Sequence, residues 1–331
     1  MCMPLGAGSC YTRVMKIHVI ELLALPAADL RAVLAPLEAA GHELRLFEDR
    51  PDGADATLER IADAEIVVIA NMPMPAAVIE AAPQLRFLAV AFTGVNHVDI
   101  AACRSRGVRV SNAAGFSTDS VAELTVGMII GLLRKLVPGD AALREGGTNA
   151  GLFGQELRGM SVGIVGTGTI GRQVAHLLRP FGVRLLGANR THYPEMVEIG
   201  MQYLELDAVL AASDIICVHV ALTEDTQQLI SRERIARMKP GARLVNLARG
   251  GVLDSAAVAE ALREGRLGGL ATDVYETEPP IASDHPFMSA PNTLLLPHVA
   301  FGTRESFHKR AEIVRENIAG WLAGTPTRVI V

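Results

Sequence analysis

Residues 161–178 read SVGIVGTGTIGRQVAHLL, and this stretch decides the class of fold. Its first residues predict a buried strand, its last residues predict a helix, and a glycine-rich turn joins the two. In the G-x-G-x-x-G spacing, Gly166 permits the tight turn, Gly168 lets the backbone approach a pyrophosphate, and Gly171 lets the helix pack on the strand. Because the motif stands between a strand and a helix, we interpret it as a dinucleotide-binding turn.

The residues that follow indicate which dinucleotide binds. The backbone N–H groups of Thr169 and Ile170 would face the phosphates at the positive end of the helix. The next strand runs into three residues that offer hydrogen-bond donors and no acid: Asn189, Arg190 and Thr191. The fork of donors on Arg190 suits a 2′-phosphate, whereas an acid at this place would bind the ribose hydroxyls. We therefore expect NADP(H), with NAD(H) as the alternative if Arg190 is only a solvated surface residue.

Short strand-like runs alternate with Ala/Leu-rich helical stretches along most of the chain, which indicates parallel sheets with crossover helices. The strand candidates are residues 16–21, 65–70, 86–91, 108–112, 161–166, 183–188, 214–220, 242–248, 267–274 and 293–298. A long helix at about 120–136 follows the first four strands, and a last helix at about 305–322 closes the chain. The sequence therefore predicts an α/β fold of two doubly wound parallel-sheet domains, a Rossmann cofactor domain and a flavodoxin-like substrate domain.

The expected boundaries divide the 331 residues into three parts. Residues 1–14 form an N-terminal extension, residues 15–112 and 300–331 form the substrate domain, and residues 113–299 form the dinucleotide-binding domain. Two domains suit a chain of this length. A ligand cleft is expected between them.

Composition and charge narrow the classes of partner. The net charge is −5 and the Lys and Arg residues form no run, so neither nucleic acid nor a membrane surface is expected as a partner. The first residues lack an apolar core of secretory length, and we expect a cytoplasmic protein. Cys2, Cys10, Cys103 and Cys217 show no spacing typical of metal ligands, so reduced thiols and no metal site are expected.

Three charged residues follow strand candidates in the second half of the chain. Arg249 follows ARLVNLA and could bind a carboxylate and a keto oxygen with its two-pronged guanidinium. His298 follows TLLLP, and a histidine beside a glutamate suits proton delivery to a ketone that receives a hydride. Glu278 and Glu276 lie in the loop between these elements, and their spacing alone does not show which one faces the histidine.

Four motifs in this order resemble those of the D-isomer-specific 2-hydroxyacid dehydrogenases. These are the glycine turn, NLARGG at 246–251, DVYETEP at 273–279 and LLPHVA at 295–300. The resemblance implies that Arg249 binds substrate, that His298 donates the proton, and that Glu278 is the partner of the histidine. It also implies further cofactor-lining positions, namely His219, Val220, Ala248 and Asp273.

The first half of the chain is expected to supply the rest of the substrate site. FTGVNHVDI at 92–100 is similar to the family's substrate loop, in which the N–H groups of Gly94 and Val95 hold the substrate carboxylate. Thr93 belongs to the same turn, and Asn71 begins the Asn-Met-Pro-Met segment after another strand. That segment lacks the arginine of phosphoglycerate dehydrogenases, and Thr93 stands where a phosphite dehydrogenase has lysine. Both departures argue against those two activities.

The expected function is therefore reduction of a small 2-keto acid by NAD(P)H to a D-2-hydroxy acid, with glyoxylate or hydroxypyruvate as substrate. The enzymatic alternative is a phosphoglycerate or phosphite dehydrogenase. The alternative from another class is an NAD(H)-sensing scaffold similar to the C-terminal-binding-protein corepressors. A homodimer is expected, with the apolar helix 121–136 and the segment 138–159 as arm and interface.

Overall fold

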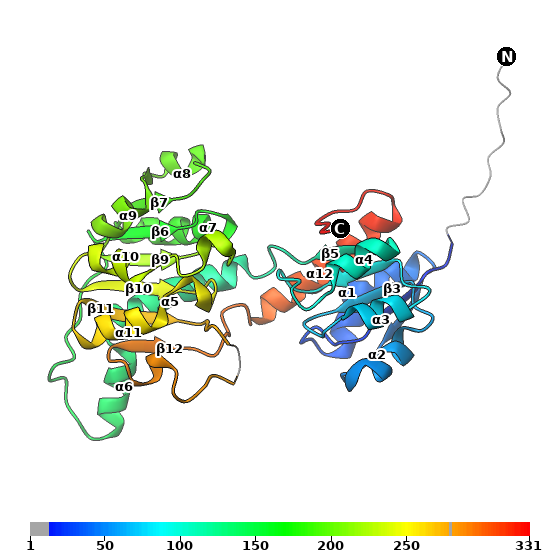
Figure 1. Ribbon diagram of the computed structural model, residues 1–331, viewed down its shortest axis with the longest axis horizontal. Helices are drawn as coiled ribbons and strands as arrows, with labels where there is room; N and C mark the ends of the chain where they lie inside the picture. The colour runs from blue at the N-terminus through cyan, green and yellow to red at the C-terminus, as the bar shows by residue number, and fades with distance from the viewer. Residues whose placement is uncertain (1–12, 278–279) are drawn as a thin grey trace, which may run out of the picture. The chain divides into compact units, whose positions relative to one another are not determined.

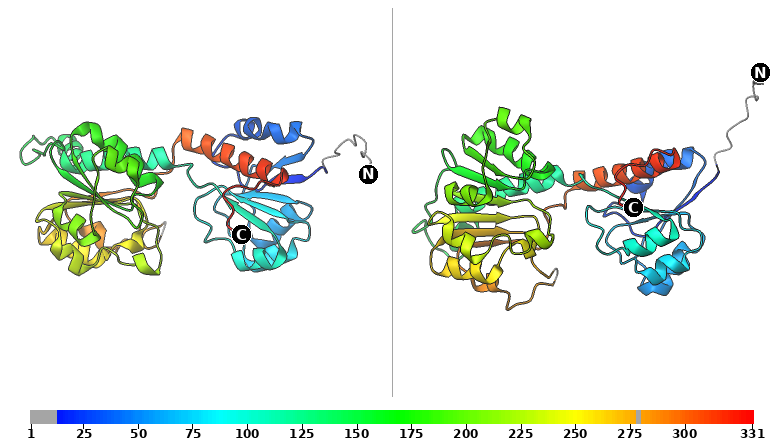
Figure 2. Two further views of the ribbon diagram at one scale, coloured as in Figure 1. Left: turned by 90° about the horizontal axis from the view of Figure 1, so that it is seen from above. Right: turned by 45° about the horizontal axis from the view of Figure 1, so that its top comes forward.

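The computed structural model describes residues 13–277 and 280–331. It divides into two compact units. The first unit runs to Phe116 and includes Thr303–Val331, and the second is Ser117–Gly302. Each is a parallel sheet covered by helices on both faces (Figures 1 and 2). The expected α/β fold with two parallel-sheet domains is confirmed.

The first unit has five parallel strands in the order β2-β1-β3-β4-β5. The strands are β1 Lys16–Val19, β2 Glu43–Leu46, β3 Ile66–Ile69, β4 Phe87–Val90 and β5 Arg109–Asn112. The helices are α1 Ala27–Ala39, α2 Gly53–Ile61, α3 Ala76–Ala81, α4 Ile100–Arg106 and α12 Arg304–Leu322. Helices α1 and α12 pack on one face of the sheet, and α2, α3 and α4 pack on the other. Both faces are covered, which explains why β3 and β4 are apolar and buried throughout.

The second unit has seven parallel strands in the order β12-β11-β10-β9-β6-β7-β8. The strands are β6 Ser161–Val165, β7 Arg184–Ala188, β8 Gln202–Tyr203, β9 Ile215–Val218, β10 Ala242–Asn246, β11 Leu267–Thr272 and β12 Thr293–Leu295. The helices are α5 Thr118–Leu133, α6 Leu136–Arg144, α7 Thr169–Leu178, α8 Pro194–Glu198, α9 Leu206–Ala212, α10 Arg232–Arg237 and α11 Ser255–Arg263. Helices α5 and α7 share one core with the sheet, and α9, α10 and α11 share the other.

Two strands and one helix break differ from the sequence expectations. Strands β2 and β8 were not expected, because β2 reads ELRL, an exposed and half-buried edge without a β-branched residue, and β8 has only two residues. The expected helix at 120–136 ends earlier, as α5, and α6 begins at Leu136. Lys135 separates them in a left-handed conformation with φ +52°. None of the helices in the described part of the chain is long and apolar enough to span a membrane.

Candidate active site

The turn between β6 and α7 has three glycines in three different surroundings. Gly166 has φ +94°, and a Cβ there would lie 2.7 Å from the carbonyl carbon of His219. A Cβ on Gly171 would lie 2.1 Å from the carbonyl oxygen of Gly166, so only glycine lets α7 approach β6 this closely. A Cβ on Gly168 would meet no atom within 4 Å. The turn is therefore closed on its two packing sides and open above Gly168, at the N-terminus of α7.

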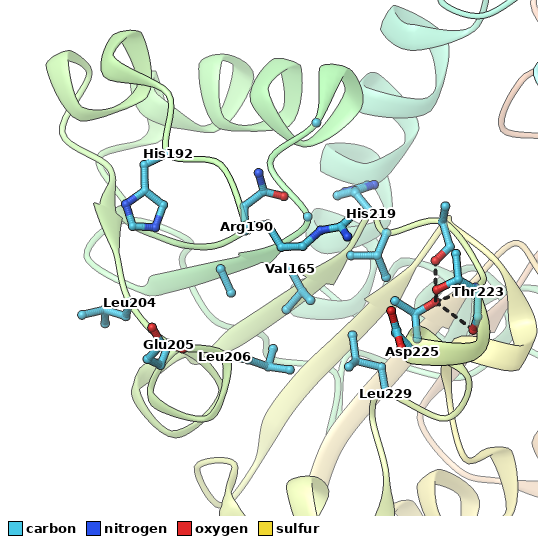
Figure 3. Close-up of a pocket in the computed structure, with 17 residues that line it drawn as sticks. Val165, Arg190, His192, Leu204, Glu205, Leu206, His219, Thr223, Asp225 and Leu229 are labelled. Carbon is cyan, nitrogen blue, oxygen red and sulfur yellow. Dashed lines mark hydrogen bonds between the residues drawn. The ribbon is translucent and has the colours of Figure 1, made fainter.

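A pocket of about 630 Å³ lies beside this turn (Figure 3). It extends across the carboxyl ends of β6, β7 and β9, and it includes the point where the strand order reverses, between β6 and β9. Of the expected cofactor residues, those that line it are Gly166, Gly168, Asn189, Arg190, His219 and Val220. The others lie outside its lining: Thr169, Ile170, Gly171, Thr191, Ala248 and Asp273.

His219 lines this pocket, and one of its ring nitrogens has no partner in the part of the chain that the structure describes. Its Nε2 is buried and has no hydrogen-bond partner among the described residues. Burial lowers the pKa of His219 to about 4, so the imidazole is neutral near pH 7. A neutral imidazole with an unused ring nitrogen can form one hydrogen bond to a bound group. Together with the open space above Gly168, this atom shows that the residues present fit a dinucleotide.

The loop after β7 brings polar side chains to the far end of the pocket. Arg190 is exposed and has no side-chain partner among the described residues, while the Asn189 side-chain amide donates to the carbonyl oxygen of Thr191 at 2.7 Å. His192, which sequence reasoning missed, lines the same end and stacks on Tyr203 of β8 with ring centroids 4.4 Å apart. His192 stands two residues after Arg190, and this closeness in sequence could have identified it as a pocket residue.

Two acids also line the pocket, and sequence reasoning missed both. Glu205 comes from the segment before α9, and Asp225 comes from the segment after β9 (Figure 3). Neither lies at the end of β7, where an acid would be expected to bind the adenosine ribose. Only the strand order brings these distant segments to the pocket.

The carboxyl ends of β10, β11 and β12 carry a second group of expected site residues. These three strands are neighbours in the sheet, so the segments that follow them meet at one edge. Arg249 follows β10, Glu276 follows β11, and His298 follows β12. Glu278 lies outside the described residues. The topology thus gathers Arg249 and His298 on adjoining segments.

Buried Asn246 fixes the end of β10, where Arg249 stands. The Asn246 side chain accepts from the backbone N–H of Ala248 and donates to the carbonyl oxygen of Arg249, both at 3.0 Å. Arg249 is exposed, and its Nη1 donates to the carbonyl oxygen of Ala248 at 2.7 Å. The rest of the guanidinium fork faces outward and can take a carboxylate.

Asp273 holds the segment that carries His298. It is fully buried, and its two carboxylate oxygens accept from the backbone N–H groups of Val299 and Ala300, each at 2.8 Å. His298 is half-buried, has φ +54°, and makes an edge-to-face contact with Phe301 at 5.6 Å. The left-handed backbone of His298 and the two hydrogen bonds after it orient the imidazole at the strand end.

The structure describes one of the two glutamates, Glu276, and shows its contacts. Ser255 at the start of α11 donates to Glu276 Oε1. His285 Nδ1 accepts from the backbone N–H of Phe287 at 3.3 Å, so its Nε2 carries the proton and donates to Glu276 Oε2 at 2.9 Å. Burial opposes ionisation of Glu276, but the hydrogen bonds from Ser255 and His285 outweigh it and lower its pKa. The Glu276 carboxylate is thus engaged away from His298.

In the first unit, the expected substrate loop follows β4. The side-chain amide of Asn112 donates to the carbonyl oxygen of Thr93 at 2.8 Å, and the backbone N–H of Val98 donates to the carbonyl oxygen of Val95 at 3.0 Å. The second bond closes a turn over residues 95–98, directly after Gly94. Asp99 behaves as expected of a capping residue, because its side chain accepts from the N–H of Ala102 at the start of α4.

Asn71 has a cationic neighbour, although the Asn-Met-Pro-Met segment itself contains no arginine. Arg50, from the loop after β2, donates to Asn71 Oδ1 at 3.4 Å. Sequence reasoning missed Arg50 because β2 itself was missed, and because 21 residues separate it from Asn71. A cation therefore does reach this loop, from another strand.

The other polar clusters contain no metal site. Within residues 13–277 and 280–331, no group of three or more His, Cys, Asp or Glu side chains could hold a metal ion. Cys103 and Cys217 are buried free thiols, and burial raises their pKa values to about 11 and about 12. The buried thiols are therefore protonated and unreactive. Cys2 and Cys10 lie outside the described residues.

The second unit, with its glycine turn, its pocket at the strand reversal and its Arg and His at adjoining strand ends, defines a dinucleotide-dependent oxidoreductase. Comparisons with known proteins agree. The family model described as D-isomer specific 2-hydroxyacid dehydrogenase, NAD binding domain, matches residues 126–300. The chain belongs to the D-isomer-specific 2-hydroxyacid dehydrogenase family and uses a nicotinamide cofactor.

Individual relatives cover most of the chain. A glyoxylate reductase of Thermofilum pendens is 35% identical over 317 residues, which are 93% of this chain and 92% of that protein. A hydroxypyruvate reductase of Blautia hydrogenotrophica is 29% identical over 323 residues, 96% of this chain and 99% of that protein. A D-3-phosphoglycerate dehydrogenase of Archaeoglobus fulgidus is 37% identical over 265 residues, 80% of this chain but 50% of that protein.

One solved structure also matches almost the whole chain. An acyclic imino acid reductase in complex with NADPH and D-Arg has a TM-score of 0.83 and 25% identity, and the match covers 96% of this chain and 100% of that one.

Replacing Gly171 and Gly168 by alanine should separate packing from cofactor binding. Gly171→Ala forces α7 away from β6 and should lower the melting temperature by roughly 4–8 °C, because a Cβ meets backbone there. Gly168→Ala finds open space and should leave the melting temperature of the cofactor-free protein within about 2 °C of wild type. It should nevertheless weaken NADPH binding at least ~10-fold, because the methyl group occupies the place of the pyrophosphate.

Thermal melts and a fluorescence titration with NADPH measure the two effects. A Gly171→Ala protein as stable as wild type would contradict the packing role, and undiminished NADPH affinity in Gly168→Ala would contradict the cradle.

Proposed function

We propose that the enzyme reduces glyoxylate or hydroxypyruvate with NADPH to the corresponding D-2-hydroxy acid. The observation that carries this proposal is the placement of Arg249 and His298 after neighbouring strands of the nucleotide-binding unit, each fixed by a buried polar side chain. The names of the glyoxylate reductase and hydroxypyruvate reductase relatives support the substrate class.

Substrate binding would use the exposed guanidinium of Arg249 and the backbone N–H groups of Gly94 and Val95. A bidentate guanidinium holds a carboxylate and the neighbouring keto oxygen in one plane, which orients the carbonyl carbon and polarises it. Thr93 and Asn71 would complete the substrate contacts in the first unit. The keto oxygen gains negative charge as the reaction proceeds, so Arg249 binds the transition state more tightly than the ground state.

Proton delivery would fall to His298. The reduced nicotinamide supplies the hydride when it is bound. The imidazolium of His298 donates its proton to the oxygen of the former ketone, and Glu278 would keep the ring charged and oriented until transfer. The engagement of Glu276 with Ser255 and His285 supports Glu278 as the partner. Asp273 fixes the backbone after His298 in the structure, and we propose that it also lies beside the nicotinamide carboxamide, with Ala248 near the same ring.

The cofactor preference rests on the end of β7. Arg190 and His192 line the pocket there, and the residues directly after β7 include no acid. Glu205 lines the same pocket and opposes a 2′-phosphate, so Arg190 has to outweigh it. We propose NADPH as the preferred cofactor, bound by Arg190 with Asn189 and Thr191 beside it. Thr169 and Ile170, at the start of α7, would hold the pyrophosphate.

A phosphoglycerate dehydrogenase is the second candidate. Relatives with that name are similar in sequence, but the chain spans only about half the length of two of them. Arg50 beside Asn71 is the one feature of the structure that favours it, because phosphate needs a cation.

A homodimer in the cytoplasm completes the proposal. Helix α6 has no buried residue, and four large apolar side chains on it and in the segment after it are between 56% and 78% exposed: Leu136, Val137, Leu143 and Phe153. Exposed apolar side chains gathered in one segment mark a protein interface. The buried free thiols of Cys103 and Cys217 suit a reducing compartment.

His298→Asn tests the proton donor. Asn tolerates the left-handed backbone but cannot donate a proton as an acid, so kcat with glyoxylate should fall by roughly 10²–10⁴. NADPH affinity should stay within about threefold, because His298 is outside the pocket lining. Steady-state kinetics and a fluorescence titration measure both, with His176→Asn on the exposed side of α7 as the control. Wild-type kcat in His298→Asn would rule out this role.

Arg190→Ala tests the cofactor preference. Loss of the guanidinium should lower the ratio of kcat/KM with NADPH to kcat/KM with NADH at least ~10-fold, because only the 2′-phosphate loses a charged hydrogen bond. Arg184→Ala, at the opposite end of β7, removes the same charge and should leave the ratio unchanged. A wild-type enzyme that prefers NADH, or an unchanged ratio in Arg190→Ala, would refute the assignment.

Light scattering tests the dimer. The proposal expects about twice the 35.2 kDa of one chain, and an aspartate at Phe153 should shift the mass toward the monomer. A mass of one chain for wild type would refute it.

A further inference from the structure

The strand order of the first unit places its ligand-binding edge at β1 and β3. In the order β2-β1-β3-β4-β5 the direction of the connections reverses between β1 and β3. Open parallel sheets bind ligands outside the carboxyl ends of the strands at this reversal. Here β1 runs into Glu21 and β3 runs into Asn71.

Glu21 fills the crevice between these two strands. Its side chain is buried, and Oε2 accepts from the backbone N–H groups of Ala70 at 2.7 Å and Met72 at 2.9 Å. These two hydrogen bonds hold the peptides on either side of Asn71. The Asn71 side chain is thereby fixed at the rim of the sheet, exposed above a closed crevice.

Arg50 bridges Glu21 and Asn71 from the loop after β2. Its Nε lies 3.7 Å from Glu21 Oε1, and its Nη1 donates to Asn71 Oδ1 at 3.4 Å. The Arg50 side chain is 52% exposed, so the rest of its guanidinium fork is accessible. Since Asn71 uses its oxygen for Arg50, its two amide N–H groups point to other partners. The rim therefore presents a set of fixed donors.

The charges around Arg50 decide what kind of group suits these donors. The Glu21 carboxylate lies within ion-pair distance of Arg50, and Asp52 lines a pocket of about 460 Å³ with Arg50, Met72 and Pro73. A phosphate dianion would meet both carboxylates and gain little net attraction. A neutral hydroxyl needs only one good donor or acceptor and gives up little hydration.

The donors on Asn71 and Arg50 lie one strand away from the loop that is proposed to bind the substrate carboxylate. Neighbouring strands lie ~4.8 Å apart, and β4, which carries Gly94 and Val95, pairs with β3. The C3 substituent of a keto acid that binds by its carboxylate after β4 and extends toward β3 lies at roughly one strand spacing, over Asn71. Glyoxylate has no C3 and does not reach this place.

We propose that Arg50, held by Glu21 and acting with Asn71, is a specificity-determining residue that selects 2-keto acids with a C3 hydroxyl group, such as hydroxypyruvate. This inference rests on the proposed function. Arg50 is not among the site residues expected from the sequence, and the group that it binds on C3 is a hydroxyl rather than a phosphate or a methyl group.

Competition between substrates tests it. The readout is the ratio of kcat/KM for hydroxypyruvate to kcat/KM for glyoxylate, and pyruvate and phosphohydroxypyruvate are measured beside them. In wild type, hydroxypyruvate should exceed both pyruvate and phosphohydroxypyruvate by at least ~10-fold, because a site with polar donors rejects an analogue that leaves them unpaired. Arg50→Met and Asn71→Leu should each lower the hydroxypyruvate-to-glyoxylate ratio by ~10-fold or more, and Arg50→Lys should lower it less.

Arg31→Met is the matched control. Arg31 is 49% exposed on α1 and pairs with Glu38, so its loss removes the same charge from the same unit and should leave the ratio as in wild type. An Arg50→Met enzyme that reduces glyoxylate and keeps the wild-type ratio would overturn the role of Arg50 while leaving the proposed function intact. Faster turnover of phosphohydroxypyruvate than of hydroxypyruvate by wild type would overturn the hydroxyl assignment. If the wild-type enzyme reduced none of the four acids, that result would contradict the proposed function itself.

Discussion

Parallel hydrogen bonding between neighbouring strands is the constraint on which the site depends. In both sheets every named strand runs in the same direction, so every strand delivers the segment after it to the same edge. The glycine turn after β6, Arg249 after β10 and His298 after β12 meet at one edge for this reason. Segments more than 100 residues apart in sequence are thereby brought to the same edge of the sheet.

Buried polar side chains fix the backbone of the segments that follow the strands. Asn246, Asp273 and Glu21 each stand at or just after a strand end, and each binds backbone groups of the segment that carries a site residue. A buried carboxylate that accepts two backbone N–H groups is costly to remove, because both donors would lose their partner. These hydrogen bonds fix the backbone of the loops after the strands, and positioning of a keto acid requires such fixed groups.

The sequence predicted the parts of this design that are local. The fold class, the dinucleotide turn and the positions of Arg249 and His298 at strand ends follow from short-range pattern and spacing. It did not predict β2 or β8, because an edge strand of alternating polar residues and a two-residue strand carry almost no hydrophobic signal. Arg50 and Glu205 were missed because the fold brings together segments that lie far apart in the sequence, whereas His192 was missed although it stands two residues after Arg190. The family resemblance alone favoured Glu278 over Glu276, and Glu278 lies outside the described residues.

Both sheets have a point where the strand order reverses, but the side chains at that point differ. At the reversal between β6 and β9, Gly166 and Gly168 remove side chains, and a pocket of about 630 Å³ remains beside His219. At the reversal between β1 and β3, Glu21 fills the crevice and ties down both neighbouring peptides. The first arrangement has room for a dinucleotide, whereas in the second a buried carboxylate occupies the strand ends and Asn71 and Arg50 are exposed above it.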